Sequence, residues 1–200
     1  GCAGGRTTLA TFTYKPTPAP INYFWFKVSV SGLNGGHSGS EIHVGLGNAN
    51  KILNRYLWEA NKKYGIILAQ IDGGNLHNAI AREAYAIAGV PSNKKEEVTI
   101  LLNTLAPQIE AELKHVDPKL KMKIESADTP TNTVDKQSMN NLLNAIYACP
   151  HGVMSMSADV EGLVETSTNL ASVKMLGDNK IVIKTSQRSS SESQKDNIVN

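Results

Sequence analysis

Three short segments of this 200-residue chain carry side chains that could do chemistry. Residues 35–41 read Gly-Gly-His-Ser-Gly-Ser-Glu, where the glycines around His37 let the backbone approach closely and expose the imidazole. Residues 72–80 read Asp-Gly-Gly-Asn-Leu-His-Asn-Ala-Ile, a tight turn that includes Asn78. Arg188 stands at the end of a predicted strand. An imidazole, an amide and a guanidinium can each donate hydrogen bonds to a ligand.

Each segment also has a plain structural interpretation when it is taken alone. The first can be a strand-to-helix turn in which Ser38 or Ser40 caps the helix. The second can be an ordinary hairpin turn, and Arg188 can be an exposed arginine. The three segments therefore favour a functional site only when they are considered together.

Other residues complete neither a metal site nor a nucleophile. The chain has no His-Glu-x-x-His motif and no Cys/His spacing typical of zinc. His115 and Asp117 lie at a predicted helix end, and Glu96 and Glu97 lie in a first helical turn, so we expect solvated surface at both places. Residues 36–40, Gly-His-Ser-Gly-Ser, miss the Gly-x-Ser-x-Gly nucleophile elbow by one position.

The composition argues against several partners. Twenty Lys and Arg against 18 Asp and Glu give a net charge of +2, without the basic stripe that nucleic-acid binding needs. No apolar run approaches the ~20 residues of a membrane span. The two cysteines, Cys2 and Cys149, form no disulfide framework, which suits a reducing compartment. We expect a cytoplasmic protein that binds neither nucleic acid nor membrane.

Hydrophobic periodicity predicts the first secondary-structure elements. Alternating apolar residues predict a strand over 22–31, and apolar spacings of three and four predict a helix over 41–64 that ends at Gly65. Two further strands are expected over 65–71 and 80–88, because both are short apolar runs bounded by turn residues.

The following elements complete an α+β domain. Ser92 is expected to cap a second helix, in which Pro107 should cause a kink or a break. Leu120, Met122 and Ile124 alternate with lysines, and this pattern predicts a fourth strand over 120–124. The order β-α-β-β-α-β is typical of a ferredoxin-like fold, an antiparallel sheet with helices on one face.

An appended helix and a β-hairpin are expected after this core. Asp135 is predicted to cap the helix, and strands over 163–175 and 180–187 are predicted to meet at a Gly-Asp-Asn turn. The single domain then divides into an opening segment (1–20), a ferredoxin-like core (21–128), the helix and hairpin extension (129–188) and the start of a further helix (189–200).

Four motifs, in the order in which they occur, resemble those of one family. They are the glycine turn around His37, Gly-Gly-x-x-x-Asn-Ala-Ile at 73–80, Val-Glu-Thr-Ser-Thr-Asn-Leu at 164–170 and Arg-Ser-Ser at 188–190. The family is the zinc metallopeptidases of the carnosinase and aminoacylase type, whose members include dipeptidases that cleave Xaa-His. The likeness extends over essentially the whole chain.

The resemblance implies that this chain is the lid of a zinc-dependent dipeptidase. Two zinc ions, their ligands and a glutamate base would lie in a missing catalytic domain, with no metal bound to this fragment. His37 would be the catalytic residue that donates to the oxyanion of the tetrahedral intermediate. Asn78 and Arg188 would bind the carboxylate of the dipeptide substrate. Asn169 and Thr168 would line the same pocket, or serve as caps and turns.

Both ends of the chain lead us to expect a piece of a longer protein. The chain starts without Met, and residues 189–192 have capping-box spacing eight residues before the last residue. We expect the fragment alone to be inactive, and the lid to form a homodimer in which His37 acts in its own or the neighbouring subunit. The alternative is a free-standing ferredoxin-like module that binds a ligand or dimerises without catalysis.

Overall fold

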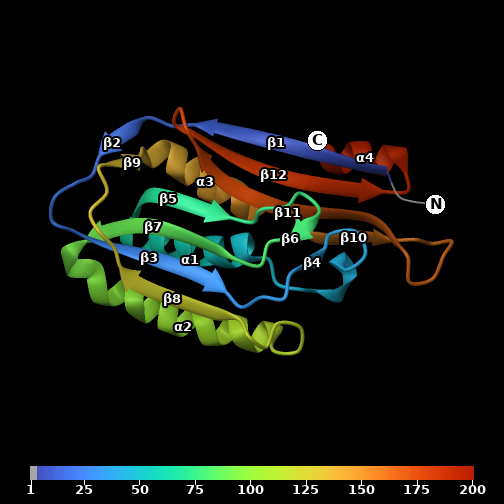
Figure 1. The fold of residues 1–200 in the computed structure, drawn as a ribbon, viewed down its shortest axis with the longest axis horizontal. Helices are drawn as coiled ribbons and strands as arrows, with labels where there is room; N and C mark the ends of the chain where they lie inside the picture. The colour runs from blue at the N-terminus through green and yellow to red at the C-terminus, as the bar shows by residue number, and fades with distance from the viewer. Residues whose placement is uncertain (1–3) are drawn as a thin grey trace.

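One antiparallel sheet of eight strands extends through the molecule, and the computed structural model describes it for residues 4–200 (Figure 1). Seven strands lie side by side in the order β1 (Gly4–Thr13), β12 (Lys180–Ser189), β11 (Val164–Leu176), β5 (Ile67–Gly73), β7 (Ala84–Pro91), β3 (Tyr23–Ser31) and β8 (Lys121–Ser126). The eighth, β10 (Gly152–Met156), also pairs with β11. The predicted α+β class is confirmed, whereas the start of the opening segment, Gly-Cys-Ala, lies outside the described residues.

The ferredoxin-like core is present as predicted. Between β3 and β5 the chain forms α1 (Ala49–Tyr64), and between β7 and β8 it forms α2 (Lys95–Leu113). The four strands lie in the order β5-β7-β3-β8 with antiparallel neighbours, because each helix connection skips one strand. Behind the sheet in Figure 1 lie α1, α2 and α3 (Lys136–Ala148), which Asp135 caps as expected.

The C-terminal hairpin continues the same sheet. Its strands β11 and β12 meet at Asp178 and Asn179, which have φ values of 60° and 55°. Val173 pairs with Gly73 of β5, so the hairpin joins the core edge to edge. The opening segment, for which no element was predicted, forms β1 along the other side of β12. Most of its residues are exposed and only Thr8 and Phe12 are half-buried, so its sequence shows no regular apolar alternation.

The core between sheet and helices is built around large apolar side chains. Phe26 of β3 packs edge to face on Tyr56 of α1, with the ring centroids 6.4 Å apart. The Tyr56 hydroxyl donates to the Val98 carbonyl of α2 at 3.0 Å, and burial raises the pKa of Tyr56 above its usual value. This contact joins the sheet to both core helices.

Several predicted boundaries are wrong. Helix α1 begins at Ala49, because a 3₁₀ turn (Ile42–Val44) and Gly45, with a φ of 79°, precede its N-cap Asn48. The strand expected over 80–88 is divided between the short β6 (Ala79–Ile80) and β7. Asn48 caps the helix, because its side-chain oxygen accepts the backbone N–H groups of Asn50 and Lys51 in the first turn.

The second helix also differs from its prediction. Ser92 does not cap it, because Ser92–Lys94 form a 3₁₀ turn and α2 begins at Lys95. The helix continues through Pro107 to Leu113 without a break. A proline removes one backbone donor, and the remaining turns are stabilised by packing of the buried face.

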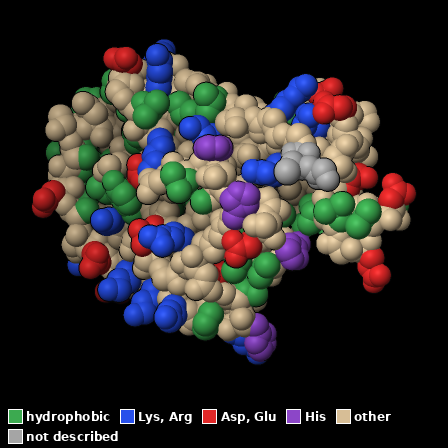
Figure 2. All heavy atoms as spheres, turned by 45° about the vertical axis from the view of Figure 1, so that its right-hand side comes forward, with side chains coloured by type: hydrophobic (Ala, Val, Ile, Leu, Met, Phe, Trp, Pro, Cys, Tyr) green, Lys and Arg blue, Asp and Glu red, His purple; other side chains and the backbone are tan. Residues whose placement is uncertain are grey.

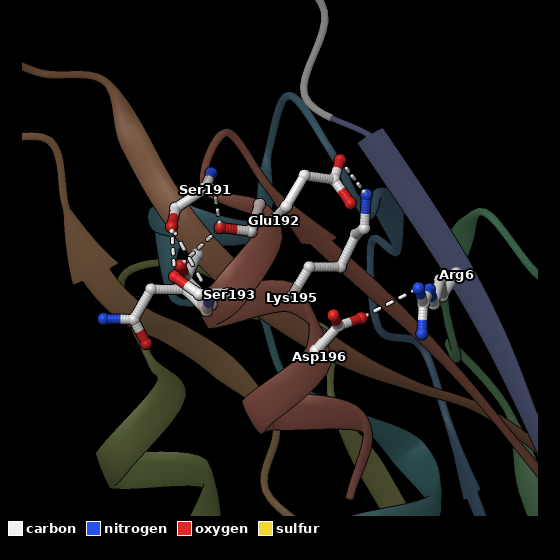
Figure 3. A network of polar contacts seen from close by, with 9 residues as sticks. Arg6, Ser191, Glu192, Ser193, Lys195 and Asp196 are labelled. Atoms are coloured by element: carbon white, nitrogen blue, oxygen red, sulfur yellow. Dashed lines mark hydrogen bonds and ion pairs between the residues drawn. The ribbon is translucent and has the colours of Figure 1, made fainter.

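The last helix, α4 (Glu192–Val199), packs on the first strand (Figure 3). Its N-cap is Ser191 and not Ser189, whose hydroxyl instead contacts Thr166 at 2.8 Å. Arg6 of β1 pairs with Asp196 at 2.8 Å, so the two ends of the described chain lie together (Figure 3).

Candidate functional site

The turns that carry His37 and Asn78 are paired with each other. Strand β4 (Gly36–His37) forms a two-residue antiparallel ladder with β6, in which His37 lies opposite Ala79. The backbone N–H of Ser38 donates to the Asn78 carbonyl at 2.9 Å. Two segments about forty positions apart in the sequence therefore form one structural unit.

The hairpin strands β11 and β12 lie next to this unit. Asn169 of β11 donates through Nδ2 to the Ala79 carbonyl at 2.8 Å. Arg188 of β12 lies opposite Ser167 of β11, and a Cβ added to Gly39 would lie only 2.9 Å from the Arg188 guanidinium. His37, Asn78, Asn169 and Arg188 are thus brought together from three strands and the turn before β6.

Thr168 lies apart from that group. It pairs with Gln187, one position from Arg188, and side chains alternate between the two faces of a strand. Thr168 is buried, and it lines neither of the hollows described below. Its position suits packing between sheet and helix better than contact with a ligand.

The His37 ring has a defined tautomer. Its Nδ1 accepts the backbone N–H groups of Gly39 at 3.2 Å and Ser40 at 3.1 Å. A nitrogen that accepts two N–H groups carries no proton, so the neutral ring has its proton on Nε2. Glu41 closes the turn, because its carboxylate accepts the His37 backbone N–H at 2.7 Å. The exposed imidazole is therefore presented as a hydrogen-bond donor.

Arg188 has no anionic partner among residues 4–200. It is half-buried and forms none of the ion pairs of the described chain, and its Nε is buried without a hydrogen-bond partner. A guanidinium taken from water without a partner is costly unless a ligand pairs with it. The geometry therefore favours an anion beside Arg188.

Two hollows meet at His37, at the end of the molecule that comes forward in Figure 2 with several histidine side chains. The Asn78 hollow, of about 530 Å³, includes Asn34, His37, Asn78 and Arg82. The Arg188 hollow, of about 360 Å³, is lined by His37, Gly39, Ser40, His43, Gly162, Leu163, Val164, Glu165, Ser167 and Arg188. Since His37 lines both, one ligand could extend from one hollow into the other past the imidazole.

A buried carboxylate positions the loops around the first hollow. Asp117 accepts the backbone N–H of Asn34 at 2.7 Å and that of Gly47 at 2.6 Å. Asp117 is only 1% exposed, so the expectation that it lies on the solvated surface is wrong. Its partners are backbone groups of two distant loops, which no spacing in the sequence indicates.

Two side chains replace a missing strand beside β11. Near Leu170 its neighbour changes from β10 to β5, and the Leu170 N–H donates to His151 Nδ1 at 3.3 Å. Asn48 Nδ2 donates to the Leu170 carbonyl at 2.8 Å. Burial, and then the charge of Lys51, lower the pKa of His151 to about 4. Sequence reasoning missed Asn48 and His151, because a helix cap and a lone histidine carry no signal of this contact.

The described residues offer no metal centre and no membrane-spanning helix. Among residues 4–200, no three His, Cys, Asp or Glu side chains gather in a way that could hold a metal ion. The zinc ions that the family resemblance implies therefore do not fit this part of the chain. None of the described helices is both long and apolar enough to cross a membrane.

Comparisons with known proteins agree with this architecture. Residues 23–117 match the family described as the peptidase dimerisation domain. Over 199 residues the chain is 36% identical to the cytosol non-specific dipeptidase of Escherichia coli (strain K12), covering all of this chain and 41% of that protein. It matches the crystal structure of the aminoacylhistidine dipeptidase from Vibrio alginolyticus with a TM-score of 0.95 and 32% identity, over 99% of this chain and 40% of that one.

The fold and these matches relate the chain to a domain that occurs in peptidases. Residues 23–117 are similar to the peptidase dimerisation domain family, and two relatives that the chain matches over nearly its whole length are dipeptidases. It spans about two fifths of the length of those relatives.

Proposed function

We propose that this chain is the lid of a dipeptidase that covers and orients the substrate, including dipeptides of the Xaa-His type. The observation that carries this proposal is the unpaired Arg188 guanidinium in the same hollow as the His37 imidazole. A bidentate cation suits the free carboxylate of a dipeptide, and a neutral donor suits the carbonyl that is attacked. The 36% identity to a dipeptidase supports the same substrate class.

His37 is the catalytic residue of this proposal. The scissile carbonyl oxygen gains negative charge as the tetrahedral intermediate forms. A hydrogen bond donated to that oxygen is therefore strongest at the transition state. The Nδ1 contacts with Gly39 and Ser40 leave Nε2–H as the donor. Glu41 and Asn169 are positioning residues, because they contact the backbone of the two turns and not the ligand.

We assign the carboxylate of the substrate to Arg188. Asn78, which was expected to share that carboxylate, lines the other hollow across His37 and is assigned as a neutral donor to the rest of the dipeptide. Only the free C-terminal residue of a peptide presents that carboxylate, so a lid that binds it restricts the enzyme to short substrates. Thr168 receives no contact with the substrate in this proposal, because it lines neither hollow.

The partner of the lid would be a catalytic domain of the same chain. The ends of the described residues lie together through Arg6 and Asp196 (Figure 3), which suits a domain inserted between two parts of another. We assign the two zinc ions and the general base to that domain, where they would supply a polarised carbonyl and an activated water. The boundaries 1–20, 21–128, 129–188 and 189–200 are proposed as the parts of one lid.

Homodimerisation is the second proposed partnership, and the family description supports it. In such a dimer His37 would act in its own active site or in that of the neighbouring subunit. We further propose a cytoplasmic location, which agrees with the name of the Escherichia coli relative.

Kinetics of the longer dipeptidase that contains this chain test the proposal. His37→Ala should lower kcat by ~10²–10³ with an unchanged metal content, because one oxyanion donor is lost. Arg188→Ala should chiefly raise KM, because binding of the carboxylate is lost in ground state and transition state alike. A His37→Ala enzyme with normal turnover would refute the catalytic role.

The alternative is a free-standing module that binds a ligand or dimerises without catalysis. The isolated 200-residue chain is expected to bind zinc weakly and to leave dipeptides intact, since no metal ligands gather among residues 4–200. Measurable turnover by the isolated chain would contradict the lid proposal. If the isolated chain binds a dipeptide and the longer protein has no dipeptidase activity, the free-standing binding module is favoured.

A further inference from the structure

The Arg188 hollow contains an acidic group that the lid function leaves unused. Glu165 lies on β11 two residues before Ser167, which pairs with Arg188, so side-chain alternation directs all three to one face of the sheet. Glu165 and Arg188 nevertheless form no ion pair with each other or with any other described residue. One hollow thus holds a cation and an anion that do not neutralise one another.

Glu165 is positioned by the neighbouring strand. The Ser155 hydroxyl of β10 donates to Glu165 Oε1 at 3.0 Å, which leaves Oε2 without a partner. The backbone carbonyl of Glu165 accepts the Ser190 N–H at 3.1 Å. A carboxylate oriented on a strand by a neighbouring hydroxyl loses little entropy when it binds a ligand.

The wall beside Glu165 is apolar. Gly162, Leu163 and Val164 line the hollow next to the carboxylate, and the Leu163 side chain is 46% exposed. A flat ring that carries an N–H needs both an apolar surface for its carbon atoms and an acceptor for its nitrogen. The hollow offers the two together.

We propose that Glu165 binds the side chain of the C-terminal residue of the substrate and selects imidazole and cationic side chains. This rests on the proposed function, in which Arg188 binds the carboxylate of that same residue. The carboxylate and the side chain belong to one residue, so they enter the Arg188 hollow together. The free amino group lies beyond the scissile carbonyl and His37, on the side of the Asn78 hollow.

Substrate preference in the longer dipeptidase tests this assignment. Glu165→Gln should lower kcat/KM for Ala-His by ~10-fold while changing that for Ala-Leu less than ~2-fold, because the acceptor loses its negative charge and only the first substrate donates a hydrogen bond to it. Glu165→Lys should reverse the preference toward Ala-Glu. Glu161→Gln is the matched control, since Glu161 lies in the loop just before β11, is exposed and lines neither hollow.

An unchanged ratio of Ala-His to Ala-Leu rates in a folded Glu165→Gln enzyme would overturn the assignment. Equal losses with both dipeptides, absent with their N-acetyl derivatives, would also overturn it, because Glu165 would then bind the amino group. The proposed function fails separately, if Arg188→Ala leaves KM unchanged for every dipeptide. Melting temperatures of the variants within a few degrees of the parent protein exclude misfolding as the cause.

Discussion

The ferredoxin-like half and the end that carries His37 satisfy their backbone groups in different ways. Strands β3, β7 and β8 pair in continuous ladders of six to eight residues. In contrast, β4 and β6 form two residue pairs, and the surrounding backbone donates to side chains from distant elements. The regular half is stabilised by burial and local pairing, whereas the end that carries His37 depends on single long-range contacts.

This contrast is sharpest at two glycines with the same left-handed φ of 68°, Gly74 beside β6 and Gly65 at the end of α1. A Cβ at Gly74 would lie 1.9 Å from the Ala171 carbonyl oxygen, whereas nothing lies within 4 Å of one at Gly65. Gly65→Ala should therefore lower the free energy of unfolding by ~1–2 kcal/mol through backbone strain alone.

Gly74→Ala should destabilise by more than ~4 kcal/mol, because the clash adds to the strain. Urea denaturation of both variants measures the two values. Equal decreases in the free energy of unfolding would show that the loops beside His37 rearrange to accept a Cβ as readily as the end of a helix does.

Two aspartates provide the next comparison. Asp117→Ala should cost ~2–4 kcal/mol, because it leaves the N–H groups of Asn34 and of the buried Gly47 without their acceptor. Asp135→Ala removes a half-buried helix cap from Ser138 and should cost ~1 kcal/mol. Amide hydrogen exchange should quicken at Asn34 and Gly47 in the first variant only. If it does not, the two loops are held by other contacts.

The pH dependence of stability provides a smaller effect. His151 has a folded pKa of about 4 and an unfolded value near ~6.5, so between these values only the unfolded chain binds the proton. The free energy of unfolding should fall by about 2 kcal/mol from pH 7 to pH 5 because of this residue.

A His151→Asn variant removes the titrating group and retains an acceptor for the Leu170 N–H. Its free energy of unfolding should therefore fall by about 2 kcal/mol less than that of the parent protein from pH 7 to pH 5. His77→Asn is the control, because His77 is exposed on a turn. Identical pH profiles for the parent protein and His151→Asn would refute the burial argument.

The sequence predicts the regular half well for physical reasons. The apolar alternation of residues 23–31, the C-cap at Gly65 and the N-cap at Asp135 are local signals, and each produces the expected element. Strand β1 was missed because most of its residues are exposed. The resemblance to a family identified the segments around His37 and Arg188, but periodicity alone did not.

The contacts that hold the loops around His37 could not be predicted from the spacing of residues in the sequence. Asp117 contacts backbone groups 70 and 83 positions away, and Asn48 contacts Leu170 across 122 positions. Such contacts depend on the final packing of the chain and leave no periodic pattern. Thr168 illustrates the converse, since it lies next to Asn169 in sequence and on the other side of the strand in space.

The central claim is that Arg188 binds the C-terminal carboxylate of a dipeptide beside His37. The most direct test compares hydrolysis of Ala-His with that of its C-terminal amide in the longer enzyme and in its Arg188→Ala variant. The parent enzyme should favour the carboxylate by ~10²-fold, and the variant should lose most of that preference because its charged partner is gone. A preference that survives in Arg188→Ala would contradict the account.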